Sequence, residues 1–338
     1  MSVVPNHNAM KKTVGAAIVV LLLFLITAAA GFVYFTYTPQ PTVPPLSAEP
    51  HPGSIRVGDL ERTYLLYVPR NLPPHSPLVM VFHGSGEDGA DIRWRTGYDF
   101  DRLADRFHFA LVYPDGYEHN WNDCRRVASY PARRLNINDI GFVISLIDQL
   151  HDSVDIDRSR VFAAGHSNGG QFVFRLAFEL PDRITAIAAI SASLPTPGNT
   201  ICTPQGKPIP VMIINGTRDP LNPYNGGEVS FYGLGNRGTV ISASASAEYF
   251  ANVDGQDSLP TVIILPHKMK SDPTSIEIKK WHQEGRPEVD LVTMIGGGHV
   301  VAQPYVPYPR FLGRTPGDLD APAEIWAFFA RQQPLKAR

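Results

Sequence analysis

One stretch of the chain constrains its fold more than any other. Val161–Gly170 reads VFAAGHSNGG, an apolar, strand-like run that ends in Gly-x-Ser-x-Gly and leads straight into a helix-like segment, Gln171–Leu180. This order is the sequence form of a nucleophile elbow, a tight turn that holds a serine hydroxyl above the edge of a parallel sheet. The turn strains the serine backbone and crowds the positions two residues away, which here are Gly165 and Gly169 and carry no Cβ. The stretch therefore predicts a reactive serine, Ser167, in an α/β domain.

A chance match is the alternative explanation of this pattern. With 28 glycines in 338 residues, it is expected about 0.1 times by accident. The strand-like run before it and the helix-like run after it are the context that a true elbow requires. A nucleophilic serine also needs a base, and the base needs an orienting acid.

Apolar runs typical of buried strands alternate with helix-like segments from residue 54 onward. The predicted strands are a hairpin in Ser54–Pro69, then Pro77–Phe82, Ala110–Tyr113, Val161–Gly165, Ile184–Ile190, Val211–Ile214 and Leu291–Ile295. The predicted helices are Gly97–Phe107, a segment around Ile140–Leu150, Gln171–Leu180, Val240–Asn252 and Leu319–Arg331. This alternation predicts an α/β domain at 54–332, with a mostly parallel central sheet and helices on both faces. Residues 220–287 are less regular, and we expect a small cap-like excursion there, beside the active site.

The N-terminal region predicts export. Val14–Phe35 is an almost unbroken apolar stretch that would span roughly 33 Å as a helix, close to the thickness of a bilayer core. Lys11 and Lys12 precede it and favour a cytoplasmic N-terminus at residues 1–13. We expect 14–37 to be a single-pass transmembrane signal anchor, with the catalytic domain outside the cytoplasm. A signal peptide cleaved near Ala28–Ala30 is the alternative and would make the protein secreted.

Residues 38–53 contain six prolines and predict an extended linker that reaches about 50 Å from the membrane.

The net charge of −2, without a basic block, gives no reason to expect a nucleic acid as partner. No metal or other cofactor is expected, because no His, Cys and carboxylate residues have zinc-like spacing. Export allows a disulfide between Cys124 and Cys202, although two free thiols are the alternative.

Two residues follow predicted strands in the order that a catalytic triad with this elbow requires, which is serine, acid, histidine. Asp219 comes after the strand Val211–Ile214, and His299 comes after Leu291–Ile295 and three glycines. We interpret the glycine loop as flexible and the His299 ring as exposed and positioned for catalysis. Asp254 and Asp257 are alternative acids, although no buried strand leads into them.

The oxyanion of an acyl-transfer intermediate needs two backbone donors. One is expected from Asn168, directly after the serine, and the other from Ser85 or Gly84 in the loop after Pro77–Phe82. His83 is interpreted as a structural residue of that loop, because it precedes the serine in the chain. His166 is ambiguous between core packing and lining of the substrate pocket.

Several motifs together resemble a known family. They are VFHGSG (81–86), WND (121–123), NDIGF (138–142), GHSNGG (165–170), NGTRDP (215–220) and GGH (297–299). In order and spacing these motifs are similar to those of a family of secreted esterases. That family contains poly(3-hydroxybutyrate) depolymerases, feruloyl esterases and acetylxylan esterases. The resemblance implies an α/β-hydrolase fold and carboxylic ester hydrolysis by Ser167, Asp219 and His299. It also implies that Trp121 and Asn122 lie near the substrate cleft, with a loop anchor as the alternative.

The expected function is therefore serine-dependent hydrolysis of small or oligomeric esters rather than of a solid polymer. The chain departs from the family after His299, where relatives often carry tryptophan and proline and this chain has Val300–Pro304. The identity of the ester is thus left open. A serine peptidase or thioesterase would use the same triad, and an inactive, membrane-tethered binding protein is a further alternative.

Overall fold

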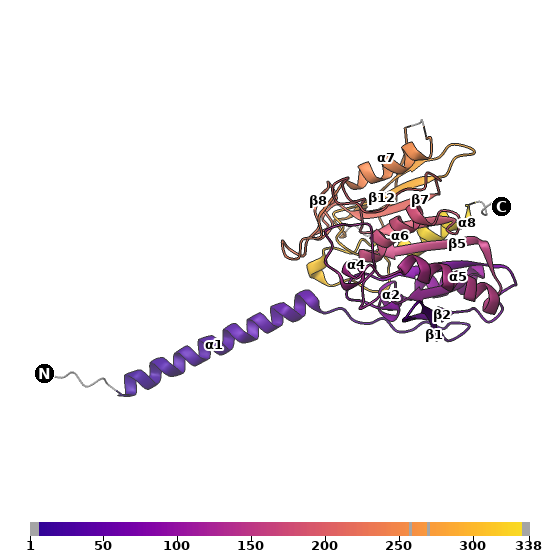
Figure 1. Cartoon of the computed structure of the whole chain (residues 1–338). Coiled ribbons are helices and arrows are strands. Elements are labelled where there is room, and N and C mark those ends of the chain that lie inside the picture. Colours follow the sequence, from indigo (N-terminus) through magenta and orange to yellow (C-terminus); the bar gives the residue numbers. More distant parts are fainter. Residues whose placement is uncertain (1–6, 257–258, 269–270, 333–338) are drawn as a thin grey trace.

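The computed structural model describes residues 7–256, 259–268 and 271–332. Its first helix, α1 (His7–Thr36), projects away from the rest of the chain (Figure 1). Within α1, Ala16–Thr36 is long and apolar enough to cross a membrane, and no residue of its most apolar window is buried. The predicted N-terminal helix is thus present, ending one residue before the expected boundary.

Ten strands of the described chain form one central sheet in the order β1-β2-β4-β3-β5-β6-β7-β12-β11-β10. Strands β3 to β7 and β12 are parallel, and antiparallel strands extend both edges. This confirms the predicted, mostly parallel sheet. The strands are β1 (His51–Val57), β2 (Leu60–Tyr67), β3 (Ser76–Phe82), β4 (Ala110–Pro114), β5 (Ile156–His166), β6 (Ala186–Ile190), β7 (Val211–Gly216), β10 (Thr261–Ile264), β11 (Ser275–Trp281) and β12 (Val289–Ile295).

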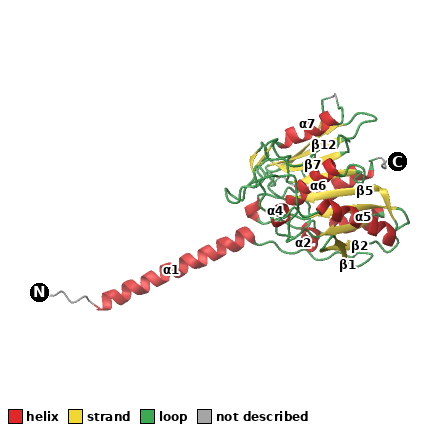
Figure 2. Cartoon of the chain, in the orientation of Figure 1, coloured by secondary structure: helices red, strands yellow, loops and turns green. Residues whose placement is uncertain are grey.

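Helices cover both faces of this sheet, as Figure 2 shows. They are α2 (Gly89–Arg95), α3 (Asp99–Phe107), α4 (Pro131–Arg134), α5 (Asp139–Val154), α6 (Asn168–Glu179), α7 (Ala243–Val253), α8 (Ala321–Ala330) and a 3-10 turn, η1 (Arg310–Leu312). Along β3, Met80 and Phe82 face a core shared with α5, α6 and α7, whereas Val79 and Val81 face a core shared with α3 and α8. A strand buried on both faces needs apolar residues throughout, which is why β3 reads as a continuous apolar run.

The region 220–287, predicted as a cap-like excursion, divides into two parts. Residues 220–240 are irregular and include a small hairpin of β8 (Gly227–Glu228) and β9 (Thr239–Val240), separate from the main sheet. The later residues instead add β10 and β11 to the sheet edge. In β11, Ile276 and Ile278 point into the core while Lys279 and Lys280 stay partly exposed. Because these charged residues interrupt the apolar pattern, the sequence does not indicate this strand.

The proline-rich segment is not the free spacer that its composition predicts. Leu46 and Ala48 pack against the apolar core. Between them, the backbone N–H and the hydroxyl of Ser47 donate to the Asp105 carboxylate at 2.8 and 2.5 Å. The strand β1 already begins at His51. Because the linker is bound along the domain, the predicted reach of about 50 Å is not available.

A disulfide joins Cys124, after β4, to Cys202, between β6 and β7. The backbone N–H of Ile201 also donates to the carbonyl of Cys124 at 2.9 Å. The bond therefore ties two long loops together on one side of the sheet.

Opening this disulfide is expected to destabilise the domain. It closes a loop of 78 residues, for which the chain-entropy model gives about 4 kcal/mol. In a chain of this size, a Cys124→Ser/Cys202→Ser variant should therefore melt roughly 10 °C below the parent in a calorimetric scan. Reduction of the parent should lower its melting temperature by a similar amount and leave the variant unchanged. Equal melting temperatures of parent and variant under oxidising conditions would contradict this role.

Candidate active site

Ser167 lies at the tight turn between β5 and α6, with φ +56° and ψ −115°. A positive φ is strained for a residue with a Cβ. The turn is held in place because the Ser167 N–H donates to the carbonyl of Ile190 at 2.8 Å. A Cβ on Gly165 would lie 2.3 Å from the carbonyl oxygen of Gly169, and one on Gly169 would lie 2.3 Å from that of Phe82. Both glycines are thus required by close packing of the elbow.

His299 and Asp219 form a buried pair at the ends of β12 and β7. The distance from His299 Nδ1 to Asp219 Oδ2 is 2.7 Å, and the two side chains are only 5% and 1% exposed. The other carboxylate oxygen accepts the backbone N–H groups of Leu221 and Asn222, both at 2.8 Å. The carboxylate thus fixes the ring and holds the proton on Nδ1, which leaves Nε2 as an acceptor.

The loop that carries His299 is tightly packed, contrary to the expectation of a flexible loop and an exposed ring. The His299 N–H donates to the carbonyl of Leu312 at 2.7 Å. A Cβ on Gly298 would lie 2.1 Å from that same oxygen. Here the glycines permit close approach of η1 rather than motion. Of the alternative acids, Asp254 is buried, and neither of its carboxylate oxygens has a partner in the part of the chain that the structure describes. Burial raises the pKa of Asp254 to about 8. Asp257 lies outside the described residues.

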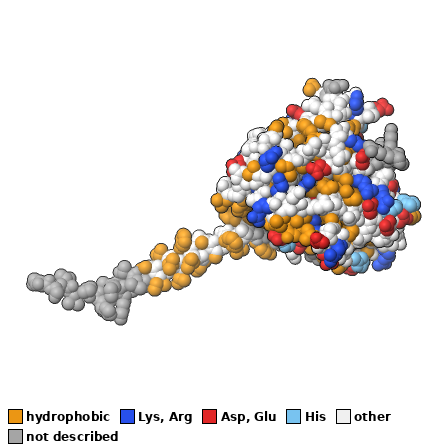
Figure 3. All heavy atoms as spheres, in the orientation of Figure 1, with side chains coloured by type: hydrophobic (Ala, Val, Ile, Leu, Met, Phe, Trp, Pro, Cys, Tyr) orange, Lys and Arg blue, Asp and Glu red, His pale blue; other side chains and the backbone are white. Residues whose placement is uncertain are grey.

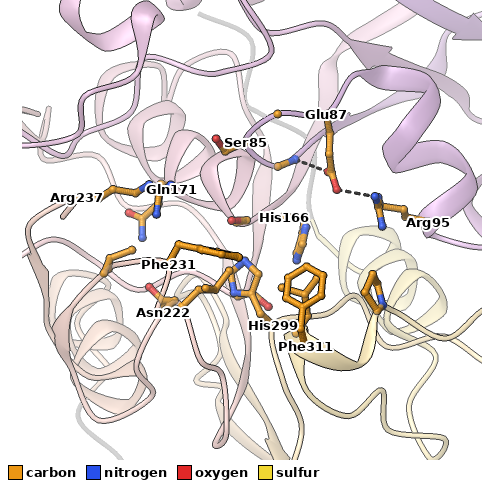
Figure 4. Close-up of a pocket in the computed structure, with 18 of the residues that line it drawn as sticks. Ser85, Glu87, Arg95, His166, Gln171, Asn222, Phe231, Arg237, His299 and Phe311 are labelled. Carbon is orange, nitrogen blue, oxygen red and sulfur yellow. Dashed lines mark hydrogen bonds and ion pairs between the residues drawn. The ribbon is translucent and has the colours of Figure 1, made fainter. Parts of the chain in front are cut away.

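Ser167 and His299 line one cavity of about 420 Å³ above the carboxyl ends of the parallel strands. Of the other predicted site residues, Gly84, Ser85 and His166 also line it. Figure 4 shows further walls, which come from α2 and the loop before it, from α6, from residues 220–240 and from η1. These walls include Glu87, Arg95, Gln171, Asn222, Phe231, Arg237 and Phe311.

The candidate oxyanion donors, the backbone N–H groups of Asn168 and of Ser85 or Gly84, differ in their hydrogen bonds. Asn168 is the first residue of α6, so its N–H has no acceptor within the helix. The N–H of Gly84 is already engaged, because it donates to Glu87 Oε2 at 2.9 Å. This favours Ser85, whose hydroxyl donates to Asn120 at 2.6 Å and orients the loop.

The structure does not bring Trp121 and Asn122 to the cavity. Trp121 is fully buried, stacks on Phe172 and donates its indole N–H to the carbonyl of His83 at 3.1 Å. The Asn122 amide nitrogen donates to the carbonyl of Ile137 at 2.8 Å. Both residues therefore serve as loop anchors, the alternative stated for them above.

The Asn168 side chain holds the loop of Trp121 and Asp123 through two hydrogen bonds. Its carbonyl oxygen accepts the Trp121 N–H at 2.7 Å, and its amide nitrogen donates to Asp123 Oδ2 at 2.7 Å. Asp123 is also bound to buried Arg125, which lines the cavity. The residue after the serine thus links the elbow to the cavity wall.

Two further histidines have different surroundings. His83 is buried and accepts the Gly116 N–H at Nε2 at 2.8 Å, as expected of a structural residue. Neither ring nitrogen of His166 has a hydrogen-bond partner among the described residues, and the ring centroid lies 5.0 Å from that of His299. Burial, together with the nearby His299 and Arg95, lowers the pKa of His166 well below its usual value.

An ion pair between Glu87 and Arg95, at 2.8 Å, borders the cavity and has no counterpart in the predicted site. Burial raises the pKa of Glu87, and Arg95 opposes that rise. Gln171, only 2% exposed, was also missed, although it follows the elbow by one helical turn. That spacing could have revealed Gln171, whereas no local motif marks Glu87.

Comparisons with known proteins agree with this site. The family model described as esterase PHB depolymerase matches residues 62–197, which hold the β3 loop and the elbow. NocK of Nocardia uniformis subsp. tsuyamanensis, which is named as an esterase, is 27% identical over 86% of this chain and 85% of its own length. Poly(3-hydroxyalkanoate) depolymerase C of Paucimonas lemoignei is 25% identical over 69% of this chain, and the match spans 57% of that relative.

A solved structure shows the same fold. Acetyl xylan esterase from Aspergillus awamori superimposes with a TM-score of 0.52 at 15% identity, over 74% of this chain and 94% of the esterase. The predicted fold and resemblance are thereby confirmed. The chain is a carboxylic ester hydrolase of the α/β-hydrolase fold, related to esterases of the poly(3-hydroxybutyrate) depolymerase type.

Proposed function

We propose that the chain hydrolyses esters through a covalent acyl-enzyme on Ser167, with His299 as base and Asp219 as the orienting acid. The observation that carries this proposal is the buried contact of 2.7 Å between His299 Nδ1 and Asp219, in the same cavity as the strained serine. Such a pairing presents His299 Nε2 as the acceptor for a hydroxyl proton.

In the first half-reaction, Ser167 Oγ attacks the ester carbonyl while His299 takes the hydroxyl proton. The N–H groups of Asn168 and Ser85 stabilise the oxyanion, and His299 then protonates the departing alcohol. In the second half-reaction a water molecule, deprotonated by His299, attacks the acyl carbonyl. The bond between the acyl carbon and Ser167 Oγ then breaks, and His299 returns the proton to that oxygen as the acid is released. Asp219 stabilises the imidazolium that forms in each half-reaction.

We further propose that α1 remains as a single-pass anchor and that the catalytic domain acts outside the cytoplasm on small or oligomeric esters. The support is the length of the exposed apolar span and the lysines before it. A panel of short acyl, feruloyl, acetylated-sugar and hydroxybutyrate esters identifies the substrate.

Removing the nucleophile tests the mechanism directly. Ser167→Ala should lower p-nitrophenyl butyrate turnover by roughly 10⁶-fold and abolish labelling by a fluorophosphonate probe. Ser191→Ala is the matched control, because it deletes a hydroxyl from the same cavity at a residue with no role in the proposed mechanism. Labelling of Ser167→Ala equal to that of the parent would refute the assignment of the nucleophile.

Replacing the acid tests the role of the buried pair. Asp219→Asn should keep the fold but reduce kcat by roughly 10⁴-fold, because an amide no longer holds the proton on Nδ1 of His299. Asp254→Asn, at a buried carboxylate that does not contact His299, should change kcat less than about tenfold. The measurement is steady-state kinetics with circular dichroism as the folding control. Similar kcat values for the two variants would exclude Asp219 as the acid.

A further inference from the structure

The end of α1 lies at the mouth of the active-site cavity. Thr36, the last residue of the helix, is one of the residues that line the cavity with Ser167 and His299. Arg310 of η1 fixes this arrangement, because its Nη1 donates to the carbonyl of Tyr34 at 2.9 Å. Its guanidinium also lies 4.3 Å from the centre of the Tyr34 ring. Figure 1 shows α1 leaving the domain from this point, so the helix starts at the side of the domain where Thr36 lines the cavity.

The length of the span places a membrane boundary at this mouth. Ala16–Thr36 contains 21 residues, or about 31 Å of helix, which matches a hydrocarbon core of about 30 Å. Tyr34 and Tyr37 at its end are 56% and 63% exposed. Tyrosines at this level are typical of the boundary between lipid and water. The linker that follows is bound to the domain at Ser47, which limits how far the domain can move away from the helix end.

A hairpin beside the cavity adds apolar side chains to the same face. Phe231, Tyr232 and Leu234 are 43%, 58% and 71% exposed. The ring of Phe231 lies 6.0 Å from that of Phe311, and the Tyr232 hydroxyl donates to the carbonyl of Phe311, so the hairpin is held against η1. Figure 3 shows apolar side chains along α1 and on the adjoining part of the domain. Exposed aromatic and leucine side chains at a tip are suited to insertion among lipids.

Three arginines complete this face. Arg218, Arg310 and Arg314 line a groove of about 1080 Å³ together with Tyr34 and Tyr37 of the helix end. All three are exposed, and none forms an ion pair with a carboxylate in the part of the chain that the structure describes. Guanidinium groups at a bilayer surface pair with lipid phosphates.

The cavity itself is amphipathic. Its polar lining residues Arg125, Gln171 and Asn222 are each about 2% exposed, whereas the apolar Phe231 is 43% exposed at the rim. An ester with a polar part inside the cavity and an acyl chain leaving past the hairpin would match this distribution.

We propose that this face, comprising the hairpin tip and the three arginines, rests on a bilayer of anionic phospholipid, and that the cavity takes its ester substrates from that bilayer. The inference rests on the proposed function, both the anchoring by α1 and the hydrolysis at Ser167. It narrows the substrate class to amphipathic esters whose acyl chain is dissolved in lipid.

Docking is measured independently of catalysis. The two native cysteines are paired, so Leu234→Cys introduces a single thiol for an environment-sensitive nitrobenzoxadiazole label. The labelled full-length protein is reconstituted into phosphatidylglycerol–phosphatidylethanolamine vesicles. The emission of the label at position 234 should then lie at shorter wavelength than that of the label in water, and spin-labelled lipid should quench it. Leu259→Cys is the matched control, because Leu259 is 93% exposed on the loop after α7. Figure 1 shows α7 at the end of the domain away from α1.

The substrate class is tested with two esters that share a leaving group, p-nitrophenyl butyrate in water and p-nitrophenyl palmitate dissolved in the vesicles. Leu234→Ser/Arg314→Glu should lower kcat/KM for the palmitate about tenfold and change that for the butyrate less than about twofold. Leu259→Ser/Arg56→Glu carries the same chemical changes at exposed positions outside this face and should affect neither ester.

The outcomes separate the two proposals. An aqueous emission at position 234 in protein that still hydrolyses the butyrate would overturn docking and leave the proposed function intact. Equal losses on both esters, or no loss on the palmitate, would overturn the assignment of the substrate class. Failure of the parent to hydrolyse either ester would count against the proposed function, and the emission measurement would still decide docking.

Discussion

The arrangement of this active site depends on how closely two backbones approach each other at the elbow. The first turn of α6 lies directly against the carbonyl groups at the end of β3, and Gly169 leaves no space there for even a methyl group. This contact forces the positive φ of Ser167 and sets the start of α6 next to the loop that carries Ser85. The strain is local, whereas the packing that maintains it extends through both cores of the sheet.

Buried polar groups extend this constraint to the loops. The Asn168 amide connects the elbow to Trp121 and Asp123, and Asp123 in turn holds Arg125 against the cavity. Each of these groups is desolvated, so the loss of one partner would leave the others unsatisfied inside the protein. This part of the cavity wall is thus held by buried polar contacts, although it consists of loop residues.

The central strands and three residues of the candidate site could be predicted because their signals are local. A strand covered on both faces reads as an apolar run, and Ser167, Asp219 and His299 each directly follow such a run or its turn. Strand β11 was not predicted, because lysines on its exposed side interrupt the pattern.

Contacts between distant segments leave no such signal. The hydrogen bond between Trp121 and Asn168 joins residues 47 positions apart, and the sequence of neither segment indicates it. For the same reason, the glycines before His299 suggested flexibility, although they accommodate Leu312. Glycine permits both close packing and motion, and only the neighbouring segment decides between them.

The attachment of the linker at Ser47 and Asp105 has a consequence for how the enzyme would meet its substrate. On a free proline-rich tether the domain could rotate and move away from the membrane, and it could then bind esters from solution in any orientation of the domain. The linker is bound at Ser47, and Arg310 holds the end of α1. Once α1 is inserted in a membrane, the domain would therefore keep one orientation and would move mainly by lateral diffusion. Encounter would then be a search in two dimensions, in which the surface density of an ester matters more than its bulk concentration.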